Sequence, residues 1–373
     1  MSMIKRLTTD RTLSGGGDAA RGSASSTETP VAGRGLLAHH SAHRMENHMR
    51  KPITATALTA AVLALSACGQ AGGEESSSSE DLTVGVANLG LSFPFPSSIG
   101  EGIRAKADEL GVELVELDGQ GKTEKQANDV QDLINQQPDG VLLLPVDSGV
   151  AVGLADQLDA AGIPTVAVAS QVGDPKEREL DDVYPTLAAL VTQQELDAGA
   201  TAGELALKAA PEGGKLAVVE GAAGFAEVEL RFARFLDPAK EAGVNFDVVA
   251  SQPGDWTAEG AQSACQNMLA SDPDIDLFYA ESDDMAVGCA NAVESAGSDA
   301  KVVGIGGSKL GVDGVTSGKI FGTVCFKPRD LGELAMQTMY DYLTGETTEE
   351  AQFVTYETPA IDQSNVDECV PQW

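Results

Sequence analysis

From residue 81 onward, short apolar runs rich in β-branched residues alternate with longer stretches whose apolar residues recur at helical spacing. Runs that are apolar at consecutive positions are typical of parallel strands covered on both faces. Strands are predicted over residues 82–87, 112–117, 140–144, 165–169, 215–219, 246–250, 277–280, 302–305 and 320–325. Amphipathic helices are predicted between them, including 99–110, 125–136, 150–161, 261–269 and 285–295. The pattern indicates an α/β protein with parallel sheets.

This alternating body is long for a single sheet. Roughly ten strand–helix units over about 290 residues predict two doubly wound lobes, with the second beginning near residue 194. No linker rich in Pro, Gly or Ser separates the two halves, which favours several crossings of the chain between them. Ligands of open parallel sheets collect at the carboxyl ends of the strands, so two facing sheets would form a cleft.

The residues ahead of this body have the pattern of an export signal. Residues 49–67 begin with Arg50 and Lys51 and continue with an apolar run over 53–65. As a helix, residues 53–67 would span only ~22 Å, short of the ~30 Å bilayer core, so they are not expected to cross a membrane. Residues 1–67 are therefore interpreted as a leader. Its upstream part is interpreted as an over-long start, with Met45 or Met49 as the initiator.

The leader ends in Leu65-Ser66-Ala67-Cys68, which resembles the bacterial lipobox. The resemblance implies acylation of Cys68 and a lipid-anchored place on the extracytoplasmic face of the cell membrane, with the lipid as the membrane contact. Residues 68–80 are rich in Gly, Ser and Glu, a composition that predicts a flexible tether.

Charge and histidine content exclude several classes of function. The formal net charge is −33, which disfavours nucleic acid and anionic lipid surfaces as partners. All four histidines precede Cys68, at His39, His40, His43 and His48. The rest of the chain therefore lacks imidazoles for His-based triads or His-ligated metal sites. Neither a metal nor a cofactor is expected.

With Cys68 acylated, four cysteines are left, an even number that suggests two disulfides outside the cytoplasm. Of the three possible pairings, Cys265–Cys289 with Cys325–Cys369 is favoured, because each pair closes a short separation within one region of the chain. Metal-binding or CxxC spacing is absent from these cysteines, so zinc binding and redox catalysis are weak alternatives.

Seven segments, in order and spacing, resemble the periplasmic sugar-binding proteins of the ribose-binding type. They are SFPF (92–95), VQDLI (130–134), VLLLPVDS (141–148), AAGIPTV (160–166), DIDLF (274–278), SDDMAVG (282–288) and VVGI (302–305). The resemblance implies two lobes joined by three crossing strands: residues 81–193 with 327–356, and residues 194–326 with 357–373. It also implies hinge closure on a small solute, which is then delivered to the permease subunits of an ABC-type importer. A monomer is expected.

Carried over residue by residue, the resemblance also implies the residues that line the cleft: Phe93, Phe95, Ala169, Ser170, Glu229, Arg231, Trp256, Ser282, Asp283, Gly306 and Phe326. Phe95 and Trp256 match positions where the family stacks aromatic rings on a sugar. The polar positions depart from the Asp, Arg, Asn and Gln of the ribose type. Ribose itself is therefore not expected. The expected solute is carbohydrate-like but larger, less polar or cyclic.

Acidic residues near the cleft leave the charge of the solute open. Glu227, Glu229, Glu281 and Asp283 would favour a cationic or amino-bearing solute, unless Arg231 pairs with one of them. Asp283 has a second interpretation, as the cap of a helix that begins at Met285.

Two other functions share parts of this pattern. A ligand-sensing module for a membrane signalling partner would have the same fold and cleft. An exported hydrolase could work with two carboxylates, but acids are abundant throughout and no G-x-S-x-G motif accompanies them. A non-enzymatic solute-binding protein is the favoured interpretation.

Overall fold

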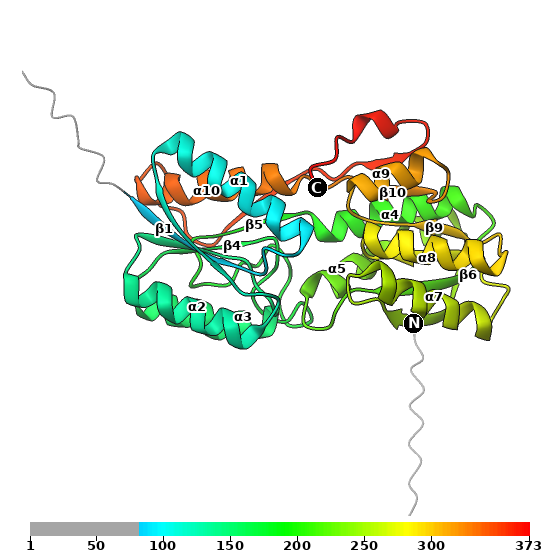
Figure 1. The fold of residues 1–373 in the computed structure, drawn as a ribbon, viewed down its shortest axis with the longest axis horizontal. Coiled ribbons are helices and arrows are strands. Elements are labelled where there is room, and N and C mark those ends of the chain that lie inside the picture. The colour runs from blue at the N-terminus through cyan, green and yellow to red at the C-terminus, as the bar shows by residue number, and fades with distance from the viewer. Residues whose placement is uncertain (1–81) are drawn as a thin grey trace, which may run out of the picture. The chain divides into compact units, whose positions relative to one another are not determined.

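The computed structural model describes residues 82–373. The predicted export signal, Cys68 and the predicted tether lie outside the described residues. Two six-stranded sheets form the body (Figure 1). The first lobe is built on the sheet with order β11-β5-β4-β3-β1-β2, and the second lobe on the sheet with order β12-β10-β9-β8-β6-β7.

All neighbouring strands of the first sheet are parallel. Its strands are β1 (Thr83–Asn88), β2 (Glu113–Asp118), β3 (Gly140–Leu143), β4 (Thr165–Val168), β5 (Ala189–Gln193) and β11 (Gln352–Tyr356). The second sheet is parallel apart from β12, which pairs antiparallel with β10. Its strands are β6 (Gly214–Glu220), β7 (Phe246–Pro253), β8 (Leu277–Ala280), β9 (Lys301–Val303), β10 (Gly322–Val324) and β12 (Ala360–Asp362).

Helices cover both faces of the first sheet, because successive strand residues point to opposite sides. Leu142 packs under α1 (Pro94–Leu110) and α10 (Pro328–Leu343), whereas its neighbours Val141 and Leu143 pack under α2 (Thr123–Gln136) and α3 (Ser148–Ala160). These strands therefore read as continuously apolar in the sequence.

The second sheet is covered in the same way. The helices α7 (Ala258–Ser271), α8 (Asp283–Ala296) and α9 (Lys309–Thr316) contribute to the core on one face. The helices α4 (Glu195–Ala209), α5 (Ala226–Phe235) and α6 (Asp237–Ala242) contribute to the core on the other. A short 3-10 helix, Val366–Glu368, precedes Cys369. Within residues 82–373, no helix has both the length and the apolar content needed to cross a bilayer.

The chain passes between the two sheets three times. It leaves the first sheet after β5 and enters α4, returns after β10 into α10, and crosses again from β11 to β12. The last two crossings are joined where the backbone N–H of Lys327 donates to the Tyr356 hydroxyl at 3.1 Å. The predicted two-lobe α/β architecture with three crossings is confirmed.

Each of the nine predicted strand ranges overlaps a strand, but β5, β11 and β12 were not predicted. The β5 run Ala189-Leu-Val-Thr-Gln193 continues directly into α4, so its apolar residues merge with those of the helix. The strands β11 and β12 lie at sheet edges, where fewer apolar residues are needed.

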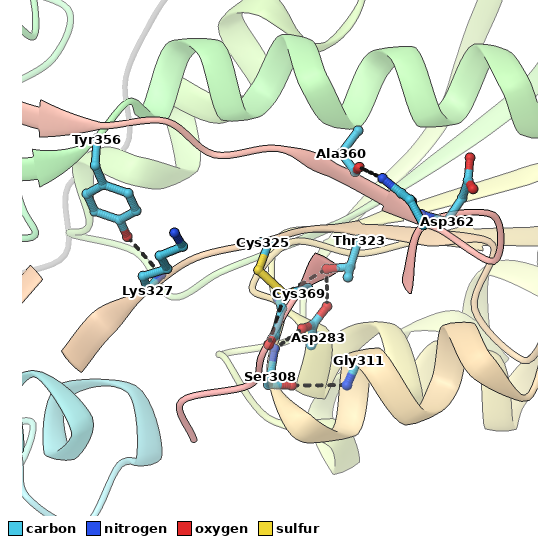
Figure 2. The surroundings of a disulfide bond; sticks show 12 residues. Asp283, Ser308, Gly311, Thr323, Cys325, Lys327, Tyr356, Ala360, Asp362 and Cys369 are labelled. Atoms are coloured by element: carbon cyan, nitrogen blue, oxygen red, sulfur yellow. Dashed lines mark hydrogen bonds between the residues drawn. A yellow bond between two sulfur atoms is a disulfide. The ribbon is translucent and has the colours of Figure 1, made fainter. Parts of the chain in front are cut away.

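The structure contains both favoured disulfides: Cys265–Cys289 joins α7 to α8, and Cys325–Cys369 joins the end of β10 to the segment after β12 (Figure 2).

Candidate ligand-binding cleft

A cavity of about 520 Å³ lies between the carboxyl ends of the two sheets. Residues at strand ends, or within three positions after them, supply much of its lining, as is typical of parallel sheets. From the first lobe these are Leu89, Leu144, Val168, Ala169, Ser170 and Gln193. From the second lobe they are Ala222, Asp255, Glu281, Ile305, Gly306 and Phe326.

Aromatic rings form much of the wall. Six line the cavity: Phe93, Phe95, Phe225, Trp256, Phe326 and Trp373. The Phe95 ring lies 5.4 Å from that of Trp373 and 6.3 Å from that of Phe326, centroid to centroid. These edge-to-face and tilted contacts leave ring faces available to an apolar surface of a ligand.

Trp256 is held by an unusual backbone conformation. Asp255 and Trp256 both have positive φ, 52° and 58°, a conformation that non-glycine residues adopt at a cost and that clusters at functional sites. Gly221 makes room for the indole, since a Cβ there would collide with the ring. The buried Trp256 Nε1 has no hydrogen-bond partner among the described residues. The turn thus presents a ring together with a free N–H donor.

A buried ion pair lies behind these rings. The Arg231 guanidinium donates to both carboxylate oxygens of Glu195, at 2.6 Å and 3.1 Å, and to the Glu281 carbonyl oxygen at 2.7 Å. It also lies over the rings of Trp256 and Phe326, with its central carbon 5.7 Å and 5.2 Å from their centroids. Arg231 therefore packs against the two rings and neutralises the charge of Glu195. The sequence alone did not place Glu195 near the cleft.

Buried carboxyl groups at the cavity have raised pKa values, and burial raises the pKa of Asp283 to about 6. Burial, with the charge of Glu195 adding to it, raises the pKa of Glu227 to about 7. Burial raises the pKa of Glu281 to about 8, partly offset by the Gly221 N–H that donates to its Oε2 at 2.9 Å. Within the described part of the chain, Glu227 Oε2 and Glu281 Oε1 lack hydrogen-bond partners.

The lobes touch each other beside the cavity. Ser170 Oγ of the first lobe donates to Glu227 Oε1 of the second at 2.6 Å. The backbone N–H of Ser148 donates to the Gly224 carbonyl at 2.8 Å, and Ser148 Oγ accepts from the Ala226 N–H at 3.1 Å. The cavity is therefore bordered by hydrogen bonds that an opening of the two lobes would break.

The structure brings the predicted site residues together at this cavity, except Glu229. Glu229 is exposed and forms an ion pair with Lys176. Residues two apart on a helix face nearly opposite directions, so α5 turns Glu227 toward the cleft and Glu229 away from it. The assignment of Glu229 to the cleft is therefore wrong.

Ser282 and Asp283 line the cavity, but their local contacts differ from expectation. Ser282 caps α8, its side chain accepting from the Met285 N–H, so the expectation that Asp283 is the cap is wrong. The Asp283 carboxylate instead accepts from the Ser308 N–H at 2.7 Å and the Thr323 hydroxyl at 2.6 Å (Figure 2). Asp283 thereby fixes the turn after β9.

Comparison with known proteins identifies the fold family. The family model described as "Periplasmic binding protein domain" matches residues 84–347. The chain belongs to this family. Among its relatives, the ribose import binding protein RbsB of Escherichia coli (strain K12) is 31% identical over 268 residues, covering 71% of this chain and 86% of that protein. The xylitol-binding protein of Mycolicibacterium smegmatis is 28% identical over 312 residues, covering 83% and 84%.

A solved structure of a solute binding protein is also similar to this chain. An ABC transporter solute binding protein from Mycobacterium smegmatis with bound glycerol is 29% identical with a TM-score of 0.69, covering 78% of this chain and 96% of that one. The family model and the RbsB relative support the resemblance to ribose-binding proteins that the sequence indicated. As a periplasmic binding protein, the chain is not an enzyme.

Proposed function

We propose that the chain captures a small polyhydroxylated solute in the cavity between its lobes and delivers it to the permease subunits of an ABC-type importer. The observation that carries this proposal is the cavity itself, which combines aromatic walls with buried polar atoms that have no partner among the described residues. Carbohydrates need both features, because rings stack on their C–H faces and polar groups bind their hydroxyls.

The relatives support a solute of this class. Ribose and xylitol appear in the names of two of them, and glycerol is bound in the related structure. The cavity of about 520 Å³ lies within the range of small-molecule sites. Its polar lining differs from that of the ribose type, since Arg231, the one cationic side chain among the described residues that line the cavity, is already paired with Glu195. A cyclic or less polar polyol suits this wall better than ribose.

Capture by hinge closure is part of the proposal. The three crossings would serve as the hinge, and the contacts of Ser148 and Ser170 with α5 and the turn before it would form as the lobes close. Anchoring through acylated Cys68 on the extracytoplasmic face completes the proposal, since it would keep the receptor beside its importer.

A ligand screen tests the proposed function. The purified protein is heated with D-ribose, D-fructose, xylitol, myo-inositol and related cyclic polyols, and the unfolding temperature is recorded. A compound at 100 times its Kd stabilises the folded protein by about 2.7 kcal/mol. The variant Glu229→Gln, outside the cavity, is expected to respond like the wild type, and Trp256→Ala to lose most of the response. Absence of stabilisation by every compound, or chemical conversion of a bound one, would overturn the proposal.

A further inference from the structure

Trp373 is a cavity residue that sequence reasoning did not identify. Its indole lines the cavity and meets the Phe95 ring edge-to-face, with centroids 5.4 Å apart. A Cβ added at Gly306 would lie 3.3 Å from the indole, so the ring also packs closely on the turn after β9. The chain has two tryptophans, Trp256 and Trp373, and both line the cavity.

The residue before it attaches this segment to the first lobe. Ser98 of α1 donates to the Gln372 carbonyl oxygen at 3.0 Å. The Gln372 side-chain oxygen accepts from the backbone N–H groups of Arg329 and Asp330 at 2.8 Å and 3.3 Å. These are N–H groups of the first turn of α10, whose own N-cap residue, Lys327, provides no side-chain cap. Gln372 therefore caps α10 from outside.

Other contacts attach the same segment to the second lobe. The Trp373 carbonyl oxygen accepts from the backbone N–H of Lys309, at the start of α9, at 2.9 Å. The segment begins at Cys369, whose disulfide fixes it to Cys325 (Figure 2). Cys325 is adjacent to Phe326, another ring of the cavity wall. Gly307, at φ 68°, packs against both sulfur atoms without a side chain of its own.

Residues 370–373 have no regular secondary structure, and Val370 is 74% exposed. The position of Trp373 therefore depends on a few attachments, of which the disulfide is the covalent one. We propose that Trp373 contacts the bound solute and that the Cys325–Cys369 disulfide positions it there. This inference rests on the proposed function and adds a specificity-determining residue to the same site.

Because the chain has two tryptophans, fluorine NMR of protein labelled with 5-fluorotryptophan observes both rings separately. Trp256→Phe and Trp373→Phe assign the two signals. In the ligand titration, with D-ribose, D-fructose, xylitol and myo-inositol as probes, both signals are expected to shift with the same saturation curve. A probe that moves the Trp256 signal alone would overturn the solute contact of Trp373. If no probe moves either signal, both the proposed function and the solute contact of Trp373 fail.

A second experiment needs no ligand, so it tests the positioning of Trp373 independently of the proposed function. In Cys325→Ser/Cys369→Ser the Trp373 signal is expected to sharpen and to gain the H₂O–D₂O isotope shift of an exposed ring, with the Trp256 signal unchanged. The matched control, Cys265→Ser/Cys289→Ser, removes the other disulfide and should leave the Trp373 signal in place. An unchanged Trp373 signal in the first variant would overturn the positioning by this disulfide.

Affinity gives the functional readout. Trp373→Ala is expected to raise the Kd of a binding probe about tenfold, which corresponds to ~1.4 kcal/mol, and Trp373→Phe to recover part of the loss. The Cys325→Ser/Cys369→Ser variant should weaken binding similarly, and the Cys265→Ser/Cys289→Ser variant much less. Equal Kd values for wild type and Trp373→Ala would contradict the proposal.

Discussion

Ser170 Oγ donates a 2.6 Å hydrogen bond to Glu227 Oε1, and this contact joins the end of β4 in the first lobe to α5 in the second. Ala169, directly before it, has φ 69°, a left-handed conformation that turns the chain at the cavity wall. The Glu227 carboxyl group therefore lies where the lobes meet, buried and close to the buried Glu195. Its protonation is coupled to folding.

This coupling predicts how stability depends on pH. Burial raises the pKa of Glu227 to about 7 and that of Glu281 to about 8, whereas an unfolded Glu titrates near 4.3. At a pH between the unfolded and folded pKa values, Glu227 and Glu281 are protonated in the folded chain and ionised in the unfolded chain. The free energy of unfolding is therefore expected to fall as pH rises from about 4.5 to about 8. Above about pH 8 these two carboxyl groups contribute no further change.

Urea denaturation between pH 5 and 8.5 measures this slope. Glu227→Gln and Glu281→Gln should each flatten it, because the amide does not titrate, while the exposed Glu229→Gln serves as the control and should leave it unchanged. A wild-type stability that rises with pH through this interval, or equal slopes in wild type and Glu227→Gln, would contradict the assignment.

The ion pair between Glu195 and Arg231 predicts a strong effect on stability. Arg231→Met leaves the Glu195 carboxylate buried without its cation, which is expected to cost about 3–5 kcal/mol. Adding Glu195→Gln should recover part of this loss. The same two helices carry a second, exposed pair, Arg234 with Asp197, and its removal should change stability by less than ~1 kcal/mol. A double-mutant cycle on each pair measures the difference, and equal coupling energies would refute the argument.

The close contact of Gly221 with Trp256 predicts a loss of binding without a loss of fold. Gly221→Ala puts a methyl group where the indole lies, so the ring must move out of the wall. Both Gly221→Ala and Trp256→Ala are expected to raise the Kd of a binding polyol about 30-fold, or ~2 kcal/mol. Calorimetric titration measures the Kd and circular dichroism checks the fold. A Gly221→Ala variant that binds like the wild type would show that the indole is not part of the site.

Much of the fold could be predicted because strands buried on both faces give apolar runs that local reading detects. Edge strands such as β11 and β12 carry less of this signal, and β5 merges with the helix that follows it. The disulfide pairing was also accessible, since short separations between cysteines limit the choices.

The site was less accessible, because its geometry depends on contacts between distant residues. Phe95, Arg231 and Trp256 were placed at the cavity by resemblance, and their contact with a solute stays a prediction. An error of two residues on α5 put Glu229 in place of Glu227, since helical phase decides which of them faces the cleft. Trp373 gave no local signal: a disulfide and the cap on α10 bring it to the cavity.

Small-angle X-ray scattering of the purified protein, with and without a polyol that stabilises it in the ligand screen, tests closure on an unchanged solute most directly. The radius of gyration is expected to decrease on saturation, and mass spectrometry of the released compound should recover it chemically unchanged. An identical radius of gyration in the empty and saturated protein, or a converted compound, would contradict the account.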